Sequence, residues 1–464
     1  MIDKIRYLIY LVCFSNILIL PAQDSVIFKY EDFMQQVIRF HPLVRQADLL
    51  VQNAQINLNI SKSFMDPLLY VSSDNKYFNN KSYYSYQEGS IKWHTKSPVG
   101  LSAGWSQNSG ENINPEFSPG SFTYMGLEIP LLQGLSIDKR RATLIQAKEF
   151  ILQSDAERRI AINQILYQAT AAYIEWWYAH QQFMIMDRFI RNLENRKKLL
   201  TVSFMNGDNS VSDTLDLNTQ YQNFLIQQNT IRLNYVNKAI QLSAFLWNEN
   251  MDTGILAESN LPDSNFEFTL APTDSLFDFF RDQNPVLEVY NSKLKILAVE
   301  KKLKWQSLLP KLDLKSKFFG IDRTIPFYSS NYPVNKNFHV SMHFGFPIFR
   351  REALGQYQLT KNKLNETTLL KSAKERELIT KLEYYLNEKN LYLTQLDQLN
   401  LLSKDLNSLL EMEYVKFRQG ESNALLLNIR EQKLIDVELK KPEVKAKLLH
   451  VIAKARELKM DYKK

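Results

Sequence analysis

Cysteine is almost absent from the sequence, since Cys13 is the single one in 464 residues. A chain with one thiol has no internal disulfide and no thiolate metal site. Glycine is also scarce, with 13 residues, and seven of them fall between Gly89 and Gly134. This composition excludes disulfide-stapled and collagen-like proteins, and it excludes a glycine-rich nucleotide-binding fold over most of the chain.

Proline is missing from two long tracts, Leu131–Leu261 and Ile348–Lys441. Helix breakers are therefore rare in both tracts, and apolar residues recur there at steps of three and four. We predict coiled-coil helices over about Asp138–Met205 and about Arg350–Arg418, each on the order of 100 Å long at 1.5 Å per residue. The apolar residues that carry this spacing are Ile162, Ile165, Ala169, Tyr173 and Trp176 in one tract, and Leu399, Leu402, Leu406 and Leu409 in the other.

Long apolar runs are absent after residue 22, so we expect no transmembrane helix. Residues 1–22 are typical of a signal peptide, with Lys4 and Arg6 before an apolar run that is too short to span a bilayer. Leu20-Pro21-Ala22 fits a cleavage site. Cys13 lies inside the apolar run and lacks the small preceding residues of a lipidation signal. We expect export without lipidation.

A strong excess of one charge is missing as well. The formal net charge is +7, or +6 without residues 1–22, and acidic residues are interleaved with the basic ones. Without a concentrated basic stripe, we expect no nucleic-acid partner. No phosphate-binding loop, zinc spacing, catalytic triad or nucleophile elbow occurs, so we expect no enzyme, no cofactor and no metal site. His339 and His343 lie about 13 Å apart on one strand face, too far to share a metal, and we assign them a polar, lumen-facing role.

The chain contains an internal repeat. Four landmarks recur in the same order, with helix-sized spacing between them, which predicts a first repeat over 23–247, a linker over 248–274 and a second repeat over 275–464. The matching pairs are His41-Pro42-Leu43 with Asn284-Pro285-Val286, Asp66-Pro67 with Leu309-Pro310, Glu128-Ile129-Pro130 with Gly345-Phe346-Pro347, and Phe204-Met205-Asn206-Gly207-Asp208 with Phe417-Arg418-Gln419-Gly420-Glu421.

Residues 67–130 and 311–347 alternate between apolar and polar side chains with a period of two. Leu312 and Leu314 alternate with charged residues, and Met342 and Phe344 alternate with histidine and small residues. In an exported, aromatic-rich chain this pattern favours an outer-membrane β-barrel over an ordinary sandwich face. Single-chain barrels start at eight strands, and lipid tolerates no open strand edge, so the chain must assemble with copies of itself.

The first repeat carries 26 more residues between its two prolines, Pro67 and Pro130, than the second carries between Pro310 and Pro347. Two further alternating segments lie there, around Ile91–Thr95 and Leu101–Ser106, and Ser97–Gly100 forms a turn between them. Two arrangements are open. Either the extra hairpin joins the wall, giving six strands per chain, or it elongates a hairpin into an extracellular cap. We favour the second, and we expect long polar loops over residues 78–88 and 108–120.

Each long helix ends at a glycine that fits a left-handed C-cap, Gly207 in one repeat and Gly420 in the other. Asp208, Asn209 or Ser210 can cap the next helix, which we predict to run to about Trp247. Glu421 and Ser422 stand in the equivalent place before a helix that we predict to run to about Lys459.

The duplicated order of short helix, proline-bounded strands, long helix, glycine turn and helix resembles the TolC-like outer-membrane efflux proteins, over about residues 25–460. This resemblance implies a fold of two repeats, in which long coiled-coil hairpins and β-hairpins form a trimeric α-barrel and β-barrel. In that family the β-barrel has four strands per chain and twelve in all, whereas six strands per chain would give eighteen. It implies a passive exit duct that an inner-membrane transporter energises through a periplasmic adaptor. The alternative is a coiled-coil envelope scaffold with a β-anchor and no channel.

The resemblance also implies roles for the helix turns, which form the tapered periplasmic end in that family. Gly207, Asp208, Gly420 and Glu421 would then dock the adaptor. Asp213, Asp216 and Asn428 are candidates for the pore gate, and helix-dipole stabilisation is the alternative role for the two aspartates. The sequence departs from the family at Leu427-Asn428-Ile429, where an aspartate often stands, so an acidic ring is expected from the first hairpin.

Overall fold

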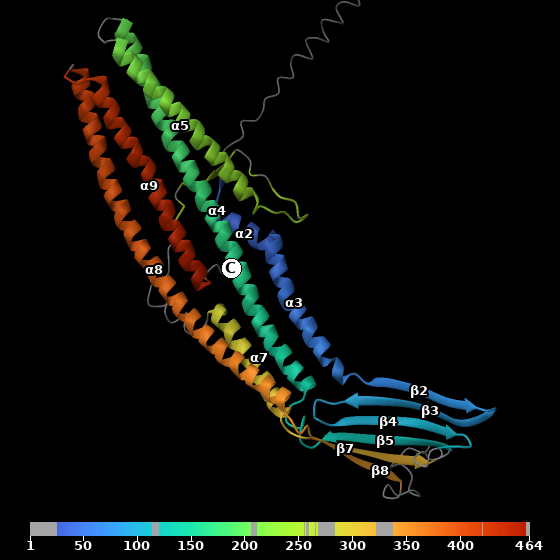
Figure 1. The fold of residues 1–464 in the computed structure, drawn as a ribbon. Coiled ribbons are helices and arrows are strands. Elements are labelled where there is room, and N and C mark those ends of the chain that lie inside the picture. The colour runs from blue at the N-terminus through green and yellow to red at the C-terminus, as the bar shows by residue number, and fades with distance from the viewer. Residues whose placement is uncertain are drawn as a thin grey trace, which may run out of the picture. The chain divides into compact units, whose positions relative to one another are not determined.

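The computed structural model describes residues 26–113, 120–205, 211–254, 256, 259–264, 266–267, 284–321, 337–419 and 421–460. The expected signal peptide lies outside these residues. The chain divides into two compact units, one formed by 1–45, 162–273 and 380–464 and the other by 46–161 and 274–379. Each unit takes segments from both sequence repeats. The two longest helices, α4 (Lys139–Met205) and α8 (Arg351–Arg418), are labelled in Figure 1, and each contributes residues to both units.

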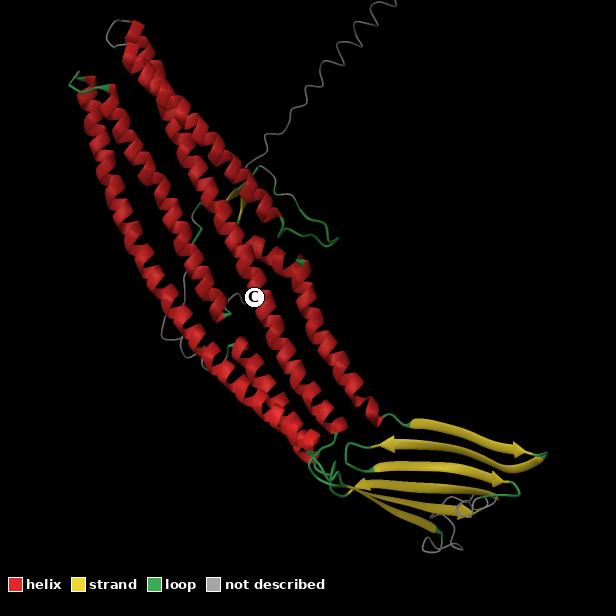
Figure 2. Ribbon diagram, in the orientation of Figure 1, coloured by secondary structure: helices red, strands yellow, loops and turns green. Residues whose placement is uncertain are grey.

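Helices dominate the described chain (Figure 2). The two longest, α4 and α8, have 67 and 68 residues and confirm the lengths predicted from the proline-free tracts. None of the helices in the described ranges is both long and apolar enough to cross a membrane. The helices are α2 (Tyr30–Phe40), α3 (Pro42–Lys62), α4 (Lys139–Met205), α5 (Val211–Ser243), α7 (Pro285–Gln306), α8 (Arg351–Arg418) and α9 (Ala424–Lys459).

The short helices begin at the duplicated proline motifs. Asn284 caps α7, since its side chain accepts a hydrogen bond from the Val286 N–H at 2.9 Å, and Pro285 occupies the first helical position. Proline suits that position because its missing N–H would have no partner there. In the equivalent motif, Pro42 begins α3 directly after His41.

The first unit has an aromatic core between α2, α4, α5 and α9. Tyr173 and Trp176 of α4 are fully buried, and the Tyr173 hydroxyl donates to the Phe28 carbonyl at 2.8 Å. Phe28 ends strand β1 (Val26–Phe28), which pairs in parallel with β6 (Asn260–Pro262). In this core, the segment before α2 and the segment after α5 therefore pack against the middle of α4.

The second unit contains a six-stranded antiparallel sheet with the order β2-β3-β4-β5-β7-β8. Residues 91–94 lie in β3 and residues 100–106 lie in β4, inside the sheet, so the predicted elongated hairpin or cap is wrong. The short 95–99 connection lets both strands continue the hydrogen-bonded ladder, and their alternation matches that of their neighbours. The strands are β2 (Leu68–Phe78), β3 (Lys81–His94), β4 (Gly100–Ser109), β5 (Gly120–Pro130), β7 (Lys311–Ile321) and β8 (Phe338–Gly345).

The expected long loop over residues 78–88 is also wrong. Only Asn79 and Asn80 separate β2 from β3, and their φ angles are 51° and 57°. Positive φ at both central residues is the geometry of a type I′ turn, which asparagine tolerates and which matches the twist of a hairpin. In the other expected loop, strand residues extend to Ser109 and resume at Gly120, and 114–119 lie outside the described residues.

The two faces of the sheet differ sharply. On one face, large apolar side chains remain exposed in the single chain, for example Val71 at 74% and Phe344 at 69%. The opposite face carries charged groups, such as the pair of Lys315 and Glu128 at 3.1 Å. This confirms the period-two alternation predicted from the sequence. Within the described residues the sheet is open, with β2 and β8 at its edges.

Candidate functional site

The second hairpin turn lies between α8 and α9. Glu421 donates its backbone N–H to the Lys416 carbonyl at 2.9 Å, the six-to-one bond that typically closes a helix C-terminus. Asn423 caps α9 by accepting from the Leu426 N–H at 2.9 Å. The predicted cap at Glu421 or Ser422 is therefore wrong, because the Ser422 hydroxyl donates to the Glu413 carboxylate instead. Gly207, Asp208 and Gly420 lie outside the described residues.

The three gate candidates from the sequence have different positions. Asp216 is exposed on α5. Asp213 belongs to α5, but its side chain lies outside the description. Asn428 is on α9 and accepts a hydrogen bond from Arg196 Nη2 at 2.6 Å. Of the candidates whose side chains are described, Asn428 is the one that joins the two hairpins.

Arg196 of α4 is the centre of this contact. Its Nη2 also donates to Gln220 Oε1 of α5 at 3.0 Å, and its Nη1 lies 2.7 Å from Glu431 Oε2 of α9. Arg196 and Glu431 are 8% and 5% exposed, so this ion pair is buried. A guanidinium has a planar set of five donors, which allows one side chain to contact α5 and α9 at once.

Tyr414 adds the fourth helix, α8. Its hydroxyl donates to Glu431 Oε1 at 2.7 Å. Burial, together with the negative charge of Glu431, raises the pKa of Tyr414 to about 12. Tyr414 therefore stays a neutral donor at physiological pH. We call these residues, which join all four helices of the two hairpins, the hairpin network: Arg196, Gln220, Tyr414, Asn428 and Glu431.

Apolar layers surround the hairpin network. Because a low-dielectric surrounding strengthens a paired charge and penalises an unpaired one, removing one partner of such a pair costs about 3–5 kcal/mol. The layers form two clusters, one of Met186, Ile190, Leu193, Leu217, Phe224 and Ile435, and one of Leu406, Leu410, Leu427 and Leu434.

Sequence reasoning missed Arg196, Tyr414 and Glu431. A signal was present, because Arg196 follows Leu193 by three residues on a stripe of apolar residues. Glu431 likewise stands between Leu427 and Leu434. A charge at a coiled-coil seam position needs a buried partner, but the sequence alone does not say which helix provides it.

A second charged cluster joins α4, α5 and α9. Glu175 Oε1 lies 2.8 Å from His450 Nε2, and Glu175 Oε2 lies 3.1 Å from Lys238 Nζ. The hydrogen bond from His450, with a further contribution from Lys238, lowers the pKa of Glu175 to about 2. This cluster shares no residue with the hairpin network. It joins α4, α5 and α9 at a different position along these helices.

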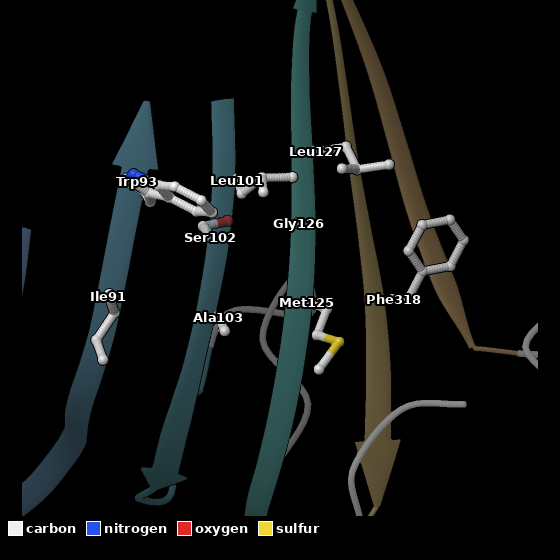
Figure 3. A pocket seen from close by; sticks show the side chains of 9 residues that line it. All are labelled: Ile91, Trp93, Leu101, Ser102, Ala103, Met125, Gly126, Leu127 and Phe318. Atoms are coloured by element: carbon white, nitrogen blue, oxygen red, sulfur yellow. The ribbon is translucent and has the colours of Figure 1, made fainter. Parts of the chain in front are cut away.

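The apolar face of the sheet has a shallow hollow of about 350 Å³. Figure 3 shows its lining side chains, among them Trp93 from β3, Leu101 from β4 and Phe318 from β7. The lining includes no charged residue, so the hollow suits hydrocarbon and not a polar ligand. In the part of the chain that the structure describes, no three His, Asp or Glu side chains group closely enough to hold a metal ion.

The fold is similar to those of several bacterial outer-membrane channels. The CmeC channel of Campylobacter jejuni superimposes with a TM-score of 0.64 at 14% identity, covering 92% of this chain and 85% of that one. VceC of Vibrio cholerae gives 0.64 at 11%, covering 92% and 95%. The open state of MtrE from Neisseria gonorrhoeae gives 0.60 at 13%, covering 93% and 87%.

Sequence comparison alone gives no match, either to a family model or to a curated protein. The structural likeness covers 92% of this chain in both CmeC and VceC. The chain has the fold of the TolC-like outer-membrane channels.

Proposed function

We propose that this protein is an outer-membrane channel that acts as the passive exit duct of an efflux or secretion system. The observation that carries the proposal is the six-stranded sheet, which exposes an apolar face and has two open edges. Lipid suits the apolar face, and closure with further copies removes the edges. The fold of CmeC, VceC and MtrE supports the same function.

In this proposal the chain is a homotrimer in the outer membrane, its helices extend into the periplasm, and an inner-membrane pump drives transport through a periplasmic adaptor. The test is to measure the mass of the detergent-purified protein and its conductance in a planar bilayer. We expect a mass of three chains and discrete conducting steps. A monomer would overturn the architecture, and a trimer without conductance would favour the envelope scaffold.

We further propose that the hairpin turns, with Gly207, Asp208, Gly420 and Glu421, are the adaptor-docking tips. The turns are the duplicated ends of the hairpins, farthest along the helices from the strands. Gly420→Val should strain the left-handed position predicted there by about 1 kcal/mol or more and impair export while trimers still form. Gly355→Ala, inside α8 with open space around the new Cβ, is the matched control. Adaptor crosslinks confined to the strands would contradict the assignment.

We propose that the hairpin network, including Asn428, holds the two hairpins together in the closed duct. Its buried ion pair connects α4 to α9, so separation of the hairpins must break it. Asp213 and Asp216 complete the proposed gate as a cation-attracting ring formed by three copies. Replacing both aspartates with alanine should lower cation selectivity in bilayer recordings, and unchanged selectivity would assign them to the helix N-terminus.

A further inference from the structure

We infer that β2 of one copy pairs with β8 of the next, so that the barrel wall contains eighteen strands and not the twelve that the resemblance implies. The inference rests on the proposed trimer. Each chain contributes six strands in one continuous sheet, and three copies give eighteen. The wall is incomplete without the neighbouring copies, since each edge strand has a partner on one side only within the described residues.

Strand direction permits this closure. All five neighbouring pairs in the sheet are antiparallel, so β8 runs opposite to β2. Copies arranged around an axis therefore bring together two antiparallel edges, and the alternation continues around the ring. A sheet with an odd number of strands would bring two parallel edges together instead.

The side chains at the two edges also match. Leu69 and Val71 of β2 lie on the apolar face, as do Met342 and Phe344 of β8, and all four are exposed in the single chain. Any register that keeps this face apolar puts Asp74 on the same face as the histidines of β8, because side chains alternate along both strands. Pairing of the two edges therefore brings apolar side chains of β2 next to apolar side chains of β8, and it puts the Asp74 carboxylate on the same face as the imidazoles of β8.

The stagger of the strands is that of a membrane barrel. A line of paired residues that starts at Leu68, the first residue of β2, passes through Lys92, Ser102, Gly126 and Lys317 and reaches His339. His339 stands six residues before the end of β8 at Gly345. With about 3.3 Å per residue and about 4.8 Å between strands, a six-residue offset over five pairings tilts the strands by about 40°.

That tilt lies in the range of 35–45° at which sheets close into membrane barrels. Strands β2, β5 and β7 have 11 residues each, a length that crosses a bilayer at this tilt. Barrel diameter grows with strand number, and barrels of about 16–18 strands enclose an aqueous channel. The added hairpin β3–β4 therefore widens the duct where it crosses the membrane.

Oxidative crosslinking tests the pairing directly. Asp74→Cys is combined in turn with His339→Cys, Ser341→Cys and His343→Cys, in a chain in which Cys13 is replaced by serine. We expect at least one pair to give covalent dimers and trimers on non-reducing gels. Asp74→Cys with Lys315→Cys is the matched control. The Lys315 side chain lies on the same face of the sheet as the histidines of β8, but on β7, one strand away from the edge. This control variant should remain monomeric on the gel.

Three outcomes separate the two proposals. Covalent trimers from β2–β8 pairs support the eighteen-stranded wall. A native trimer by mass that gives no β2–β8 crosslink overturns the wall but leaves the proposed duct intact. A native monomer overturns both. Deletion of 81–109 offers a second measurement, because β2 and β5 remain antiparallel, and the shortened chain should form a narrower pore with lower conductance.

Discussion

Arg196 and Glu431 occupy positions at which a coiled coil normally buries apolar side chains. Two well-packed apolar residues would give similar or greater stability, so a buried ion pair is poorly explained by stability alone. It does give the two hairpins a specific alignment, since Arg196 reaches Gln220, Asn428 and Glu431 only in one arrangement. In the proposed duct, this specificity suits a contact that opens and re-forms.

Glu431→Gln should destabilise the closed arrangement of the hairpins, by up to about 3–5 kcal/mol, because Arg196 is left buried without a counter-charge. We expect a lower midpoint of thermal unfolding in detergent and more open-channel time in bilayer recordings. Asp436→Asn, at an exposed position of the same helix α9, is the control and should shift stability by less than about 0.5 kcal/mol. The double variant Arg196→Met with Glu431→Leu should recover the thermal midpoint, and a failure to recover would contradict the uncompensated-charge argument.

Glu175 predicts a specific acid sensitivity. Its pKa of about 2 in the folded chain lies below the usual value of 4.5, so the ionised group stabilises the fold at neutral pH. That contribution is lost as the pH falls from about 4.5 through about 2. The side chain is 35% exposed, so solvent screening reduces the effect. Thermal midpoints measured from pH 6 to pH 2.5 should fall less steeply in Glu175→Gln than in the wild type. If the thermal midpoint of Glu175→Gln depended on pH in the same way as that of the wild type, Glu175 would not contribute to the acid sensitivity. Glu249→Gln, at an exposed ion pair, is the control.

Among the elements, the sheet depends on a close approach at Gly104 of β4. A Cβ there would lie 2.8 Å from the Gly89 carbonyl oxygen and 2.8 Å from the Tyr124 ring. Gly104→Ala should therefore force β3 and Tyr124 apart and reduce the yield of assembled protein in the outer membrane. Gly89→Ala, whose Cβ meets nothing within 4 Å, should assemble normally. Equal yields of the two variants would show that the close approach is not required.

Which residues form helices and strands was easier to predict from the sequence than which helices contact one another. The long helices followed from tracts without proline, and the strands followed from alternation, because both patterns are local. The polar composition of residues 78–88 predicts a loop, but Asn79 and Asn80 form a type I′ turn instead, because asparagine tolerates positive φ. The hairpin network was missed because it joins residues as far apart as Arg196 and Glu431, and helix periodicity alone does not align one hairpin with the other.

For the whole molecule, the sheet predicts where each turn lies with respect to the membrane. Residues 95–99 connect strands at the end of the sheet where β2 begins and β5 ends, the end at which the chain enters from α3 and leaves to α4. Asn80 lies at the opposite end. With Cys13 replaced, an impermeant maleimide should label Asn80→Cys on intact cells and Val99→Cys only after the outer membrane is permeabilised. Labelling of Val99→Cys on intact cells would exclude the hairpin from the wall.

The hairpin formed by β3 and β4 shows how the sheet of this fold can gain strands by insertion. The chain leaves β2 at one end of the sheet, passes through β3 and β4, and enters β5 at that same end, so the polypeptide arrives where it would have arrived without the insertion. Neither the helices before β2 nor those after β5 need to move. In the proposed barrel, evolution can therefore resize the wall in steps of one hairpin per subunit, while the helices keep their connections to the sheet.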